Sequence, residues 1–332
     1  MRRISIGLHG ILRIGCFLLL ASATSYGVDY DPLAVSEDFT LQEVDLTVKD
    51  IRRHRDIPIR VYLPQATQAA PVVLFSHGLG GSREGSGYLG KHWAARGYVA
   101  VFLQHPGSDT SVWKDTAREK RMNAMRDAAS LQNFLLRVKD VPAVLDQLAE
   151  WNNMEGHALA GRLNLTKIGM SGHSFGAATT QAVSGQRTDR GKDLFTDARI
   201  AAAVIMSPSS PNRGSPQEAF GKISLPWMLM TGTKDVSLVV DTDVDSRLAV
   251  FKALPPGGKY EVVLHGAEHS AFADRALPGD REARNPNHHR AVLALSTAFW
   301  DTYLLDSVAA QQWLDGAGPR SLLDDQDKWQ TK

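Results

Sequence analysis

Residues 167–178 read Lys-Ile-Gly-Met-Ser-Gly-His-Ser-Phe-Gly-Ala-Ala. The apolar start, residues 167–170, predicts a short buried strand, and the small residues at the end predict a helix that follows it directly. A serine on so sharp a strand-to-helix turn needs neighbours without bulk, which Gly172 and Gly176 supply. The amino end of the helix also favours negative charge that develops at the serine. Ser174 is therefore the predicted nucleophile.

A base and an acid for this serine are found further along the chain. A serine hydroxyl is a weak nucleophile unless a base takes its proton, and a histidine base needs a carboxylate to orient it. Where a serine stands on such a turn, the acid precedes the histidine in the chain. Residues 227–231 and 260–265 predict two strands, and Asp235 and His269 lie in the loops after them. Catalytic loops gather at the carboxyl ends of parallel strands, so Asp235 is the predicted acid and His269 the predicted general base.

Three other histidines are alternatives for the base. His265 lies within the predicted strand 260–265, where a packed side chain is the expected role. His288 and His289 open the predicted final helix, where capping or a surface position is expected. We therefore prefer His269, which alone lies in the loop after the last predicted parallel strand.

Three aspartates are alternatives for the acid. Asp241, Asp243 and Asp245 alternate along the chain, and could replace Asp235 or bind a cation. The other interpretation of these aspartates is a solvated helix start, where the helix dipole favours acidic side chains. Asp235 is preferred because it lies just past the end of a predicted strand.

The loop after the predicted strand 72–76 carries a second catalytic feature. Residues 76–81 read Ser-His-Gly-Leu-Gly-Gly. Attack on a carbonyl produces an oxyanion, which hydrogen-bond donors stabilise. One donor is the amide of the residue after the nucleophile, and the other comes from the loop after the third strand. We therefore expect the amides of Phe175 and Leu79 to form an oxyanion hole, with His77 shaping the loop.

Strand and helix patterns alternate along most of the chain. Several segments are nearly continuous apolar runs, as strands buried on both faces require, whereas the first two alternate and fit an antiparallel edge. The sequence thus predicts one α/β domain, residues 28–315, with an eight-stranded, mostly parallel sheet flanked by helices on both faces. The predicted strands are residues 39–48, 57–63, 72–76, 98–104, 167–170, 200–206, 227–231 and 260–265. The predicted helices are residues 88–96, 115–136, 141–151, 175–184, 244–254 and 290–305.

Composition and charge exclude several classes of protein. Of the 332 residues, 43% are hydrophobic and 22% are charged, which is typical of a globular protein and not of a disordered or fibrous one. The chain has 37 lysines and arginines against 36 acidic residues, for a net charge of +1, so no nucleic-acid partner is predicted. Cys16 is the only cysteine, so neither a disulfide within the chain nor a cysteine metal site is expected, and no metal is predicted.

The two ends of the chain differ from the domain between them. Arginines near the start precede a short apolar run at residues 14–21 and then small residues, which is typical of a secretory signal peptide. Residues 1–23 or 1–27 are therefore expected to be removed, and the protein to be exported to the periplasm or outside the cell. The apolar run is about half of the ~20 residues that span a bilayer, so no stable membrane anchor is expected. Residues 316–332 are polar and are predicted to form a loosely held tail.

A family resemblance rests on three segments. Residues 71–105 contain Pro-Val-Val-Leu-Phe-Ser-His-Gly-Leu-Gly and Ala-Ala-Arg-Gly-Tyr-Val-Ala-Val-Phe-Leu-Gln-His, and resemble the plasma-type platelet-activating-factor acetylhydrolase family. Residues 172–179 and 269–274 strengthen the likeness, which covers roughly residues 40–305. The resemblance implies an α/β-hydrolase fold, a serine triad and no cofactor. It also implies short-chain or phospholipid ester substrates, as for a 1-alkyl-2-acetylglycerophosphocholine esterase.

One feature departs from that family. The animal acetylhydrolases carry the acid after the strand that follows the nucleophile helix, but here residues 206–209 read Met-Ser-Pro-Ser. The acid lies one strand later, at Asp235, as in bacterial cutinase-like polyester hydrolases and in dienelactone-hydrolase-like proteins. The latter use a cysteine nucleophile, so their activity is not expected from a serine. The reaction type carries over from the resemblance, whereas the acetyl-phospholipid substrate does not follow from it.

The predicted activity is that of a secreted serine hydrolase that cleaves carboxylic esters through an acyl-enzyme. Residues 115–136 are placed to act as a partial lid or as a plain surface helix. Arg137 and Asp140, which follow them, are expected to form a structural ion pair. The alternatives are a polyester hydrolase, a serine peptidase of the same fold, or a non-catalytic binding protein. The substrate, a small-molecule or lipid ester, is expected to contact three side chains after the third and fourth strands: Tyr88, His105 and Trp113.

Overall fold

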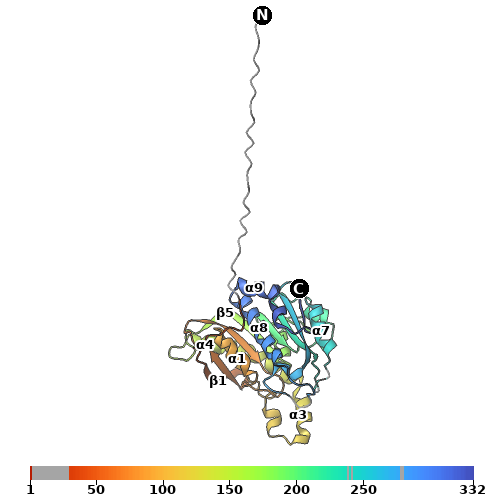
Figure 1. Ribbon diagram of the computed structural model, residues 1–332. Helices are drawn as coiled ribbons and strands as arrows, with labels where there is room; N and C mark the ends of the chain where they lie inside the picture. The colour runs from red at the N-terminus through yellow and green to blue at the C-terminus, as the bar shows by residue number, and fades with distance from the viewer. Residues whose placement is uncertain (2–29, 238, 241, 277–279) are drawn as a thin grey trace.

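The computed structural model describes Met1 and residues 30–237, 239–240, 242–276 and 280–332. The predicted signal peptide, beyond Met1, lies outside the described residues, and so does Cys16. Asp241, one of the alternatives to Asp235, also lies outside them. The described chain forms strands and helices in alternation, as Figure 1 shows.

The strands of the described chain form one nine-stranded sheet in the order β1-β2-β4-β3-β5-β6-β7-β8-β9. Neighbours from β4 to β8 in this order run parallel, whereas β1, β2 and β9 pair antiparallel. Every residue of β3 and β4 is buried, which explains their continuous apolar sequences. The predicted mixed α/β class with a mostly parallel sheet is confirmed. The strands are β1 (Gln42–Asp50), β2 (Arg55–Leu63), β3 (Ala70–Ser76), β4 (Val99–Leu103), β5 (Leu163–His173), β6 (Ile200–Met206), β7 (Trp227–Lys234), β8 (Lys259–Glu268) and β9 (Lys328–Thr331).

The number of strands is nine in the described chain and not the predicted eight. The additional strand, β9, lies within residues 316–332, which the sequence predicts as a loosely held tail. It pairs antiparallel with β8, and the ring of Trp329 stacks on Tyr260 with centroids 5.7 Å apart. A four-residue strand with one aromatic side chain is too short to show a pattern in the sequence. Its stability comes from its pairing with β8, which the sequence of the segment does not reveal.

The helices differ from the prediction between β4 and β5. Where the sequence predicts helices at residues 115–136 and 141–151, the chain forms short segments followed by one long helix, α4, which runs through Pro142. Ser130 begins α4 by accepting a hydrogen bond from the amide of Asn133. A proline within a helix costs about 3 kcal/mol, which the burial of apolar side chains on α4 offsets. The α-helices are α1 (Gly87–Ala95), α2 (Ser111–Lys114), α3 (Arg121–Ala128), α4 (Leu131–Asn152), α5 (Phe175–Val183), α6 (Pro216–Phe220), α7 (Val244–Ala253), α8 (Pro286–Leu304), α9 (Val308–Asp315) and α10 (Gly318–Leu322). The 3₁₀ segments are η1 (Ile51–Arg53), η2 (Arg118–Lys120) and η3 (His269–Phe272).

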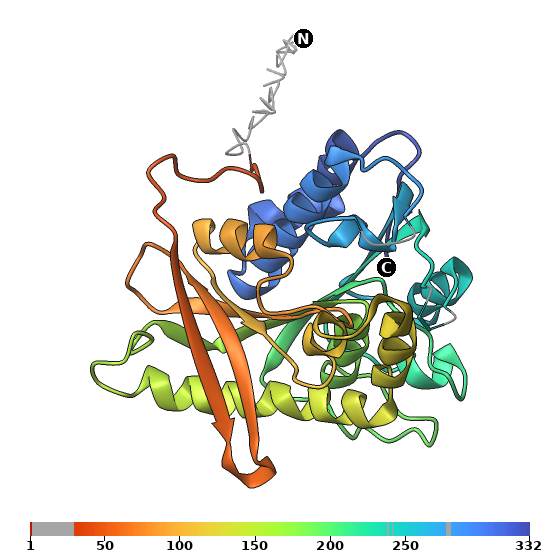
Figure 2. The ribbon, with the colours of Figure 1, turned by 90° about the horizontal axis from the view of Figure 1, so that it is seen from below.

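Alternate residues of β3 pack into different apolar clusters. Val72 and Leu74 pack in a cluster with side chains of α4, whereas Val73 and Phe75 pack in a cluster with side chains of α1 and α8. This alternation follows the two-residue period of a strand. In Figure 2, the long helix α4 lies on one side of the strands, and α1 and α8 lie on the other. The two clusters thus pack against opposite faces of the sheet, and the loops that follow its parallel strands lie at their carboxyl ends.

One part of the chain projects from the rest. The segment with α2 and α3 leaves the carboxyl end of β4, and α3 projects at the bottom of the view in Figure 1. It therefore starts at the same edge of the sheet as the loops after β3 and β5. Within the described residues, no helix combines the length and the apolar character needed to span a bilayer.

Candidate functional site

Ser174 stands at a tight turn between the end of β5 and the start of α5. Its φ of 58° costs a non-glycine residue about 1–3 kcal/mol, and such residues cluster at functional sites. A Cβ atom on Gly172 would lie 2.3 Å from the carbonyl oxygen of Gly176, and one on Gly176 would lie 1.8 Å from that of Ser76. Because only glycine fits at both positions, β3, β5 and α5 can approach closely enough to form the turn.

Ser174, His269 and Asp235 form a continuous row of hydrogen bonds. His269 Nε2 lies 2.8 Å from Ser174 Oγ, and His269 Nδ1 lies 2.7 Å from Asp235 Oδ1. Asp235 directly follows β7, and His269 begins η3 directly after β8. The strands β5, β6, β7 and β8 are successive parallel neighbours, so the segments after them meet at one edge of the sheet. The structure thus brings together the three side chains that the sequence selects.

The carboxylate of Asp235 is fully buried, yet it is held in its charged form. Burial by itself raises the pKa of Asp235, but the neighbouring His269 and Arg247 outweigh burial and hold that pKa well below its usual range. Thr231 Oγ1 also donates a hydrogen bond to Asp235 Oδ2 at 3.0 Å. A fixed negative charge on this side of the imidazole can stabilise a proton that His269 takes from Ser174.

Arg247 on α7 is a residue of this site that the sequence analysis missed. Its side chain is buried, and its Nε lies 3.1 Å from Asp235 Oδ1. The guanidinium also donates hydrogen bonds to the main-chain oxygens of Asp235, Ser207 and Pro208, and its Nη2 lies 3.3 Å from His269 Nδ1. No local pattern marks an arginine for such a role, because all of its partners come from other segments of the chain.

The alternative histidines have other partners. His288 Nε2 lies 3.1 Å from the main-chain oxygen of His265, which joins α8 to β8. His289 stacks on Tyr88 with ring centroids 4.0 Å apart. His265 is exposed near the end of β8, and not packed as the sequence predicts. His288 is buried, and Asn285 caps α8, so the capping or surface position expected for His288 is wrong. His289 is half-buried.

The alternative aspartates begin a helix. The side chain of Asp243 accepts a hydrogen bond from the amide of Ser246 at 2.8 Å and caps α7. Asp245 is exposed in the first turn of α7, where the helix dipole stabilises acidic side chains. These two residues therefore take the helix-start role. Within the described chain, no group of three or more histidine, cysteine, aspartate or glutamate side chains is arranged to hold a metal ion.

Phe175 directly follows the serine, and the loop that carries Leu79 runs beside it. Strands β3 and β5 are parallel neighbours, so the loop after β3 runs beside the turn at Ser174. A Cβ atom on Gly78 would lie 3.4 Å from Ser174 Cβ, which is ordinary van der Waals contact. Among the described residues, neither amide donates a hydrogen bond to another protein group. Unused main-chain amides near a nucleophile are the kind of donor that binds an oxyanion.

Two buried histidines fix the loops around the serine. His77 Nδ1 lies 2.6 Å from the main-chain oxygen of Gly78, and His77 Nε2 accepts a hydrogen bond from the amide of His105. Burial lowers the pKa of His77 well below its usual value, so the ring is neutral with its proton on Nδ1. His173 Nε2 lies 2.9 Å from the main-chain oxygen of His269, and burial lowers the pKa of His173 to about 3. His77 thus shapes the loop after β3, and His173 holds the segment that carries His269.

Two of the predicted wall residues lie at loops of the site. Trp113 is half-buried, and its Nε1 donates a hydrogen bond to the main-chain oxygen of Gly80 at 2.7 Å. Tyr88 is also half-buried, and its hydroxyl donates to the main-chain oxygen of Phe272 at 3.3 Å, at the end of η3. Trp113 therefore lies next to the loop of Leu79, and Tyr88 next to the segment of His269.

The third predicted wall residue, His105, lies in the interior. Its side chain is fully buried, with Nε2 2.9 Å from Ser76 Oγ and Nδ1 2.9 Å from Asp140 Oδ2. The structure therefore does not place His105 on an open substrate wall. The expected ion pair between Arg137 and Asp140 is also not formed, because Asp140 pairs with His105 and with arginines of the β1–β2 hairpin, among them Arg55.

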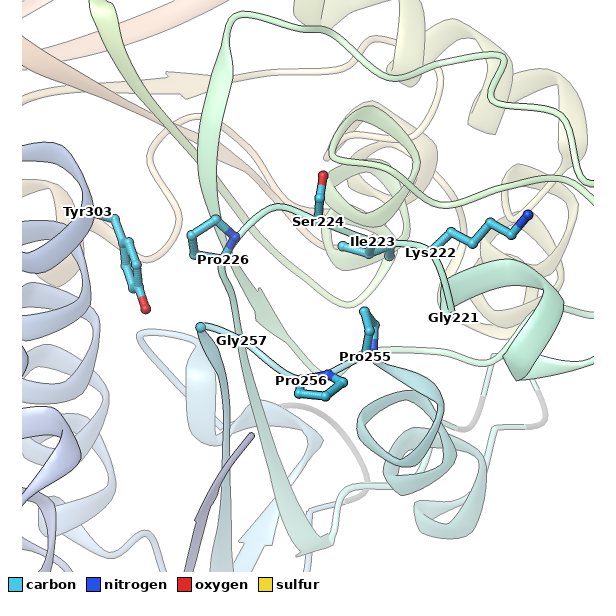
Figure 3. A pocket seen from close by; sticks show the side chains of 10 residues that line it. Gly221, Lys222, Ile223, Ser224, Pro226, Pro255, Pro256, Gly257 and Tyr303 are labelled. Atoms are coloured by element: carbon cyan, nitrogen blue, oxygen red, sulfur yellow. The ribbon is translucent and has the colours of Figure 1, made fainter.

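A hollow of about 620 Å³, whose lining Figure 3 shows, contains none of these side chains. It is formed by the loops that precede β7 and β8, together with Tyr303 of α8. Asp235 and His269 follow the same two strands at their opposite ends, so roughly 25 Å of strand separates the hollow from them. Its lining consists mainly of proline and glycine, and its polar side chains are Lys222, Ser224 and Tyr303. The hollow is therefore separate from the three hydrogen-bonded side chains at the carboxyl edge of the sheet.

The model of the family described as platelet-activating factor acetylhydrolase, isoform II, matches residues 60–141. The chain resembles the platelet-activating factor acetylhydrolases. The matched segment runs from β2 into α4 and contains Leu79 and Trp113, but it ends before Ser174. Among curated proteins there is no match to the chain. The acetylhydrolases are an α/β-hydrolase-type family, so the resemblance supports a hydrolase of the lipase or esterase type that acts on a small-molecule or lipid substrate.

Proposed function

We propose that the protein is a serine hydrolase that cleaves carboxylic esters, with Ser174 as nucleophile, His269 as general base and Asp235 as the orienting acid. The observation that carries this proposal is the row of hydrogen bonds, 2.8 and 2.7 Å long, that joins the three side chains at a strained serine turn. The resemblance to the acetylhydrolases rests on an earlier part of the chain and supports the same type of reaction.

The reaction proceeds through an acyl-enzyme. Ser174 Oγ attacks the carbonyl carbon of the ester while its proton passes to His269 Nε2. Asp235 accepts the hydrogen bond from His269 Nδ1 and stabilises the imidazolium without taking the proton. The tetrahedral intermediate collapses, the alcohol leaves with the proton from Nε2, and the acyl group stays on Ser174. Water then gives a proton to His269 Nε2 as it adds to the acyl carbon. When this second intermediate collapses, His269 returns the proton to Ser174 Oγ and the carboxylic acid leaves.

The negative charge on the carbonyl oxygen is stabilised by two main-chain donors. In this proposal the amides of Leu79 and Phe175 donate hydrogen bonds to the oxyanion at each addition step. Loss of one such donor costs about 3–4 kcal/mol of transition-state stabilisation. The proposal is supported by the position of the loop at Gly78 against Ser174 and by the lack of other partners for both amides in the described chain.

The proposed substrates are short-chain esters or acetyl-phospholipid-like esters. The acetylhydrolase resemblance supports them, as does Trp113, which packs against the loop of Leu79 and restricts the space beside it. The place of the acid after β7 is shared with cutinase-like enzymes, so polyesters form a second class to be tested. Amide hydrolysis would use the same groups, and is tested by the leaving group.

We also propose that the protein is exported to the periplasm or outside the cell. The proposal is supported by the basic start, the apolar run at residues 14–21 and the small residues after it. Sequencing the amino end of the protein from a cell fraction tests it. A mature start after residue 23 or 27 is expected, and an intact start in the cytosol would contradict export.

The decisive experiment measures hydrolysis of p-nitrophenyl acetate, butyrate and octanoate, together with an acetyl-phospholipid, a polyester film and an anilide. Ser174→Ala is compared with Ser184→Ala, which removes a buried hydroxyl that donates to Thr180 at the end of the same helix. Activity that disappears in Ser174→Ala and persists in Ser184→Ala is expected. The chain-length profile then identifies the acyl group.

Each other outcome points to a specific alternative. Ester hydrolysis that persists in folded Ser174→Ala would refute the assignment of the nucleophile. Preference for the anilide over every ester would favour a peptidase, and activity confined to the film would favour a polyester hydrolase. Folded protein without hydrolysis of any of these compounds would leave a non-catalytic binding protein.

A further inference from the structure

The guanidinium of Arg137 lies between the two segments that supply the proposed oxyanion donors. Arg137 belongs to α4, and its side chain is fully buried. Burial lowers the pKa of Arg137 to about 9, so the group remains charged at neutral pH. A buried charge is costly unless its hydrogen-bond donors are satisfied. Within the described chain, its donors bind neutral oxygens in place of a carboxylate.

One side of the guanidinium holds the loop of Leu79. Arg137 Nη2 donates a hydrogen bond to the main-chain oxygen of His77. Nη1 donates to Ser108 Oγ at 3.0 Å, and the main-chain oxygen of Ser108 accepts a hydrogen bond from the amide of Gly80 at 2.8 Å. The chain is thus tied to Arg137 on both sides of Leu79, which leaves the amide of Leu79 little freedom to turn.

The other side of the guanidinium holds Phe175. The Cζ atom of Arg137 lies 4.6 Å from the centre of the Phe175 ring, a cation–π contact. Arg137 Nε donates to Thr179 Oγ1 at 3.1 Å, and Thr179 Oγ1 donates to the main-chain oxygen of Phe175 at 3.0 Å. Both the side chain and the main chain of Phe175 are therefore linked to the same planar group.

Arg137 is also hydrogen-bonded to a buried row of three side chains. Arg137 Nη2 donates to Ser76 Oγ, so the hydroxyl proton of Ser76 is free to bind His105 Nε2, and His105 Nδ1 donates to Asp140. Burial lowers the pKa of His105 to about 4, so the imidazole is neutral. Burial raises the pKa of Asp140, but its bonds to His105 and Arg55 lower that pKa to about 2. This serine, histidine and aspartate have no exposed surface, so they cannot meet a substrate, and they hold the end of β3 instead.

We propose that Arg137 is a positioning residue that sets the distance and direction between the amides of Leu79 and Phe175. A planar fork bonded to both segments fixes their separation more firmly than two loops that move independently. Such pre-organisation matters most in the transition state, when the oxyanion forms. The proposal rests on the proposed function, since the two amides act only if Ser174 attacks a carbonyl.

The test compares Arg137→Lys and Arg137→Met with the unaltered full-length protein. Lysine keeps the charge but lacks the planar fork, so kcat/KM is expected to fall about tenfold to a hundredfold, chiefly through kcat. Methionine removes both, and a fall of about 10²–10³-fold is expected, the range for loss of one oxyanion donor. Arg96→Lys is the matched control, because Arg96 pairs with Asp301 at the far end of α1. Its kcat/KM is expected to stay within about twofold.

The second measurement separates positioning from a purely structural role. A trifluoromethyl ketone adds to the serine and forms a stable tetrahedral oxyanion, so its Ki reports the geometry of the two amides. In Arg137→Lys, Ki is expected to rise by the same factor as kcat/KM falls, while KM changes little. Partial unfolding would lower kcat per total protein but would leave Ki unchanged. If the Arg137 variants do not fold, Thr179→Val breaks one link to Phe175 and is expected to change both quantities by about threefold to tenfold.

The outcomes distinguish the two proposals. Unchanged Ki and kcat/KM in folded Arg137→Lys or Thr179→Val would overturn the role of Arg137 while the proposed function stands. Absence of Ser174-dependent hydrolysis in the unaltered protein would overturn the proposed function, and the role of Arg137 with it.

Discussion

Arg247 Nε lies 3.1 Å from Asp235 Oδ1, the same carboxylate oxygen that lies 2.7 Å from His269 Nδ1. The buried carboxylate thus has a permanent cation on one side and the imidazole on the other. Because Arg247 also donates to the main-chain oxygens of Ser207 and Pro208, it joins the segment after β6 to the segment after β7. An arginine of α7 therefore determines where the carboxylate of Asp235 lies.

Arg247→Met is expected to destabilise the fold. The buried carboxylate of Asp235 would lose its permanent partner and three main-chain oxygens would lose a donor, at a cost of about 3–5 kcal/mol in the free energy of unfolding. Urea denaturation measures this change. Arg199→Met is the control, because the partly exposed pairs of Arg199 with Asp146 and Asp197 are worth about 1 kcal/mol or less. Equal losses in the two variants would contradict the structural role of Arg247.

Asp235→Asn is expected to reduce kcat about 10⁴-fold with little change in structure, because an amide cannot orient His269 in the productive tautomer. Ester hydrolysis and a circular dichroism spectrum check both parts of this prediction. Asp243→Asn is the matched control, since asparagine also caps a helix and the activity should be retained. A larger loss of activity in Asp243→Asn would favour the rival aspartates as the acid.

Gly176→Ala is expected to prevent the serine turn from forming. Its Cβ would lie 1.8 Å from the main-chain oxygen of Ser76, so β3 and α5 would have to separate, at a cost of about 3 kcal/mol or more. Thermal unfolding and ester hydrolysis should both show the loss. Gly156→Ala meets no atom within 4 Å and carries only the strain of its positive φ, about 1 kcal/mol. The prediction fails if Gly176→Ala retains both stability and activity.

Glu261→Gln is expected to make the fold more stable above neutral pH. Burial raises the pKa of Glu261 from 4.5 to about 7, so the folded protein keeps a proton that the unfolded chain has already lost between these pH values. The stability that this group contributes is therefore fully present below pH 4.5 and is lost as pH rises to about 7. The glutamine variant lacks this loss, and should gain on the order of 1–3 kcal/mol over the unaltered protein at pH 8. Urea denaturation at pH 4.5 and pH 8 tests it, and an equal difference at both values would contradict it.

The predictions agree best with the structure where they rest on residues close together in the sequence. The strand, glycine and serine pattern at residues 167–178 predicts a turn, and Ser174 has the positive φ that such a turn needs. The eight predicted strands are present as β1 to β8, because each has its own apolar pattern. Where the pattern is weak, the prediction is incomplete: β9 depends on its pairing with β8, and α4 continues through Pro142 because its apolar side chains are buried.

The site could be predicted only in part. Ser174, Asp235 and His269 follow three strands in a fixed order, so their meeting follows from the topology of a parallel sheet. The positions of the two buried arginines at the site do not follow from the topology of the sheet. Arg247 could be matched to Asp235 only in three dimensions, and Arg137 does not pair with Asp140 three residues away but binds segments 29 to 61 residues away in the chain.

By itself, the sequence determined the alternation of strands and helices, the serine turn and the order of serine, acid and histidine. These depend on residues close together in the chain, where sterics and apolar periodicity act directly. Only the tertiary structure decided that His105 lies in the interior, that Asp243 caps a helix while Asp235 meets His269, and that Arg137 and Arg247 hold the loops. Each of these depends on which distant groups share a buried space, where an unpaired polar group is costly and its partner is set by the packing of the whole sheet.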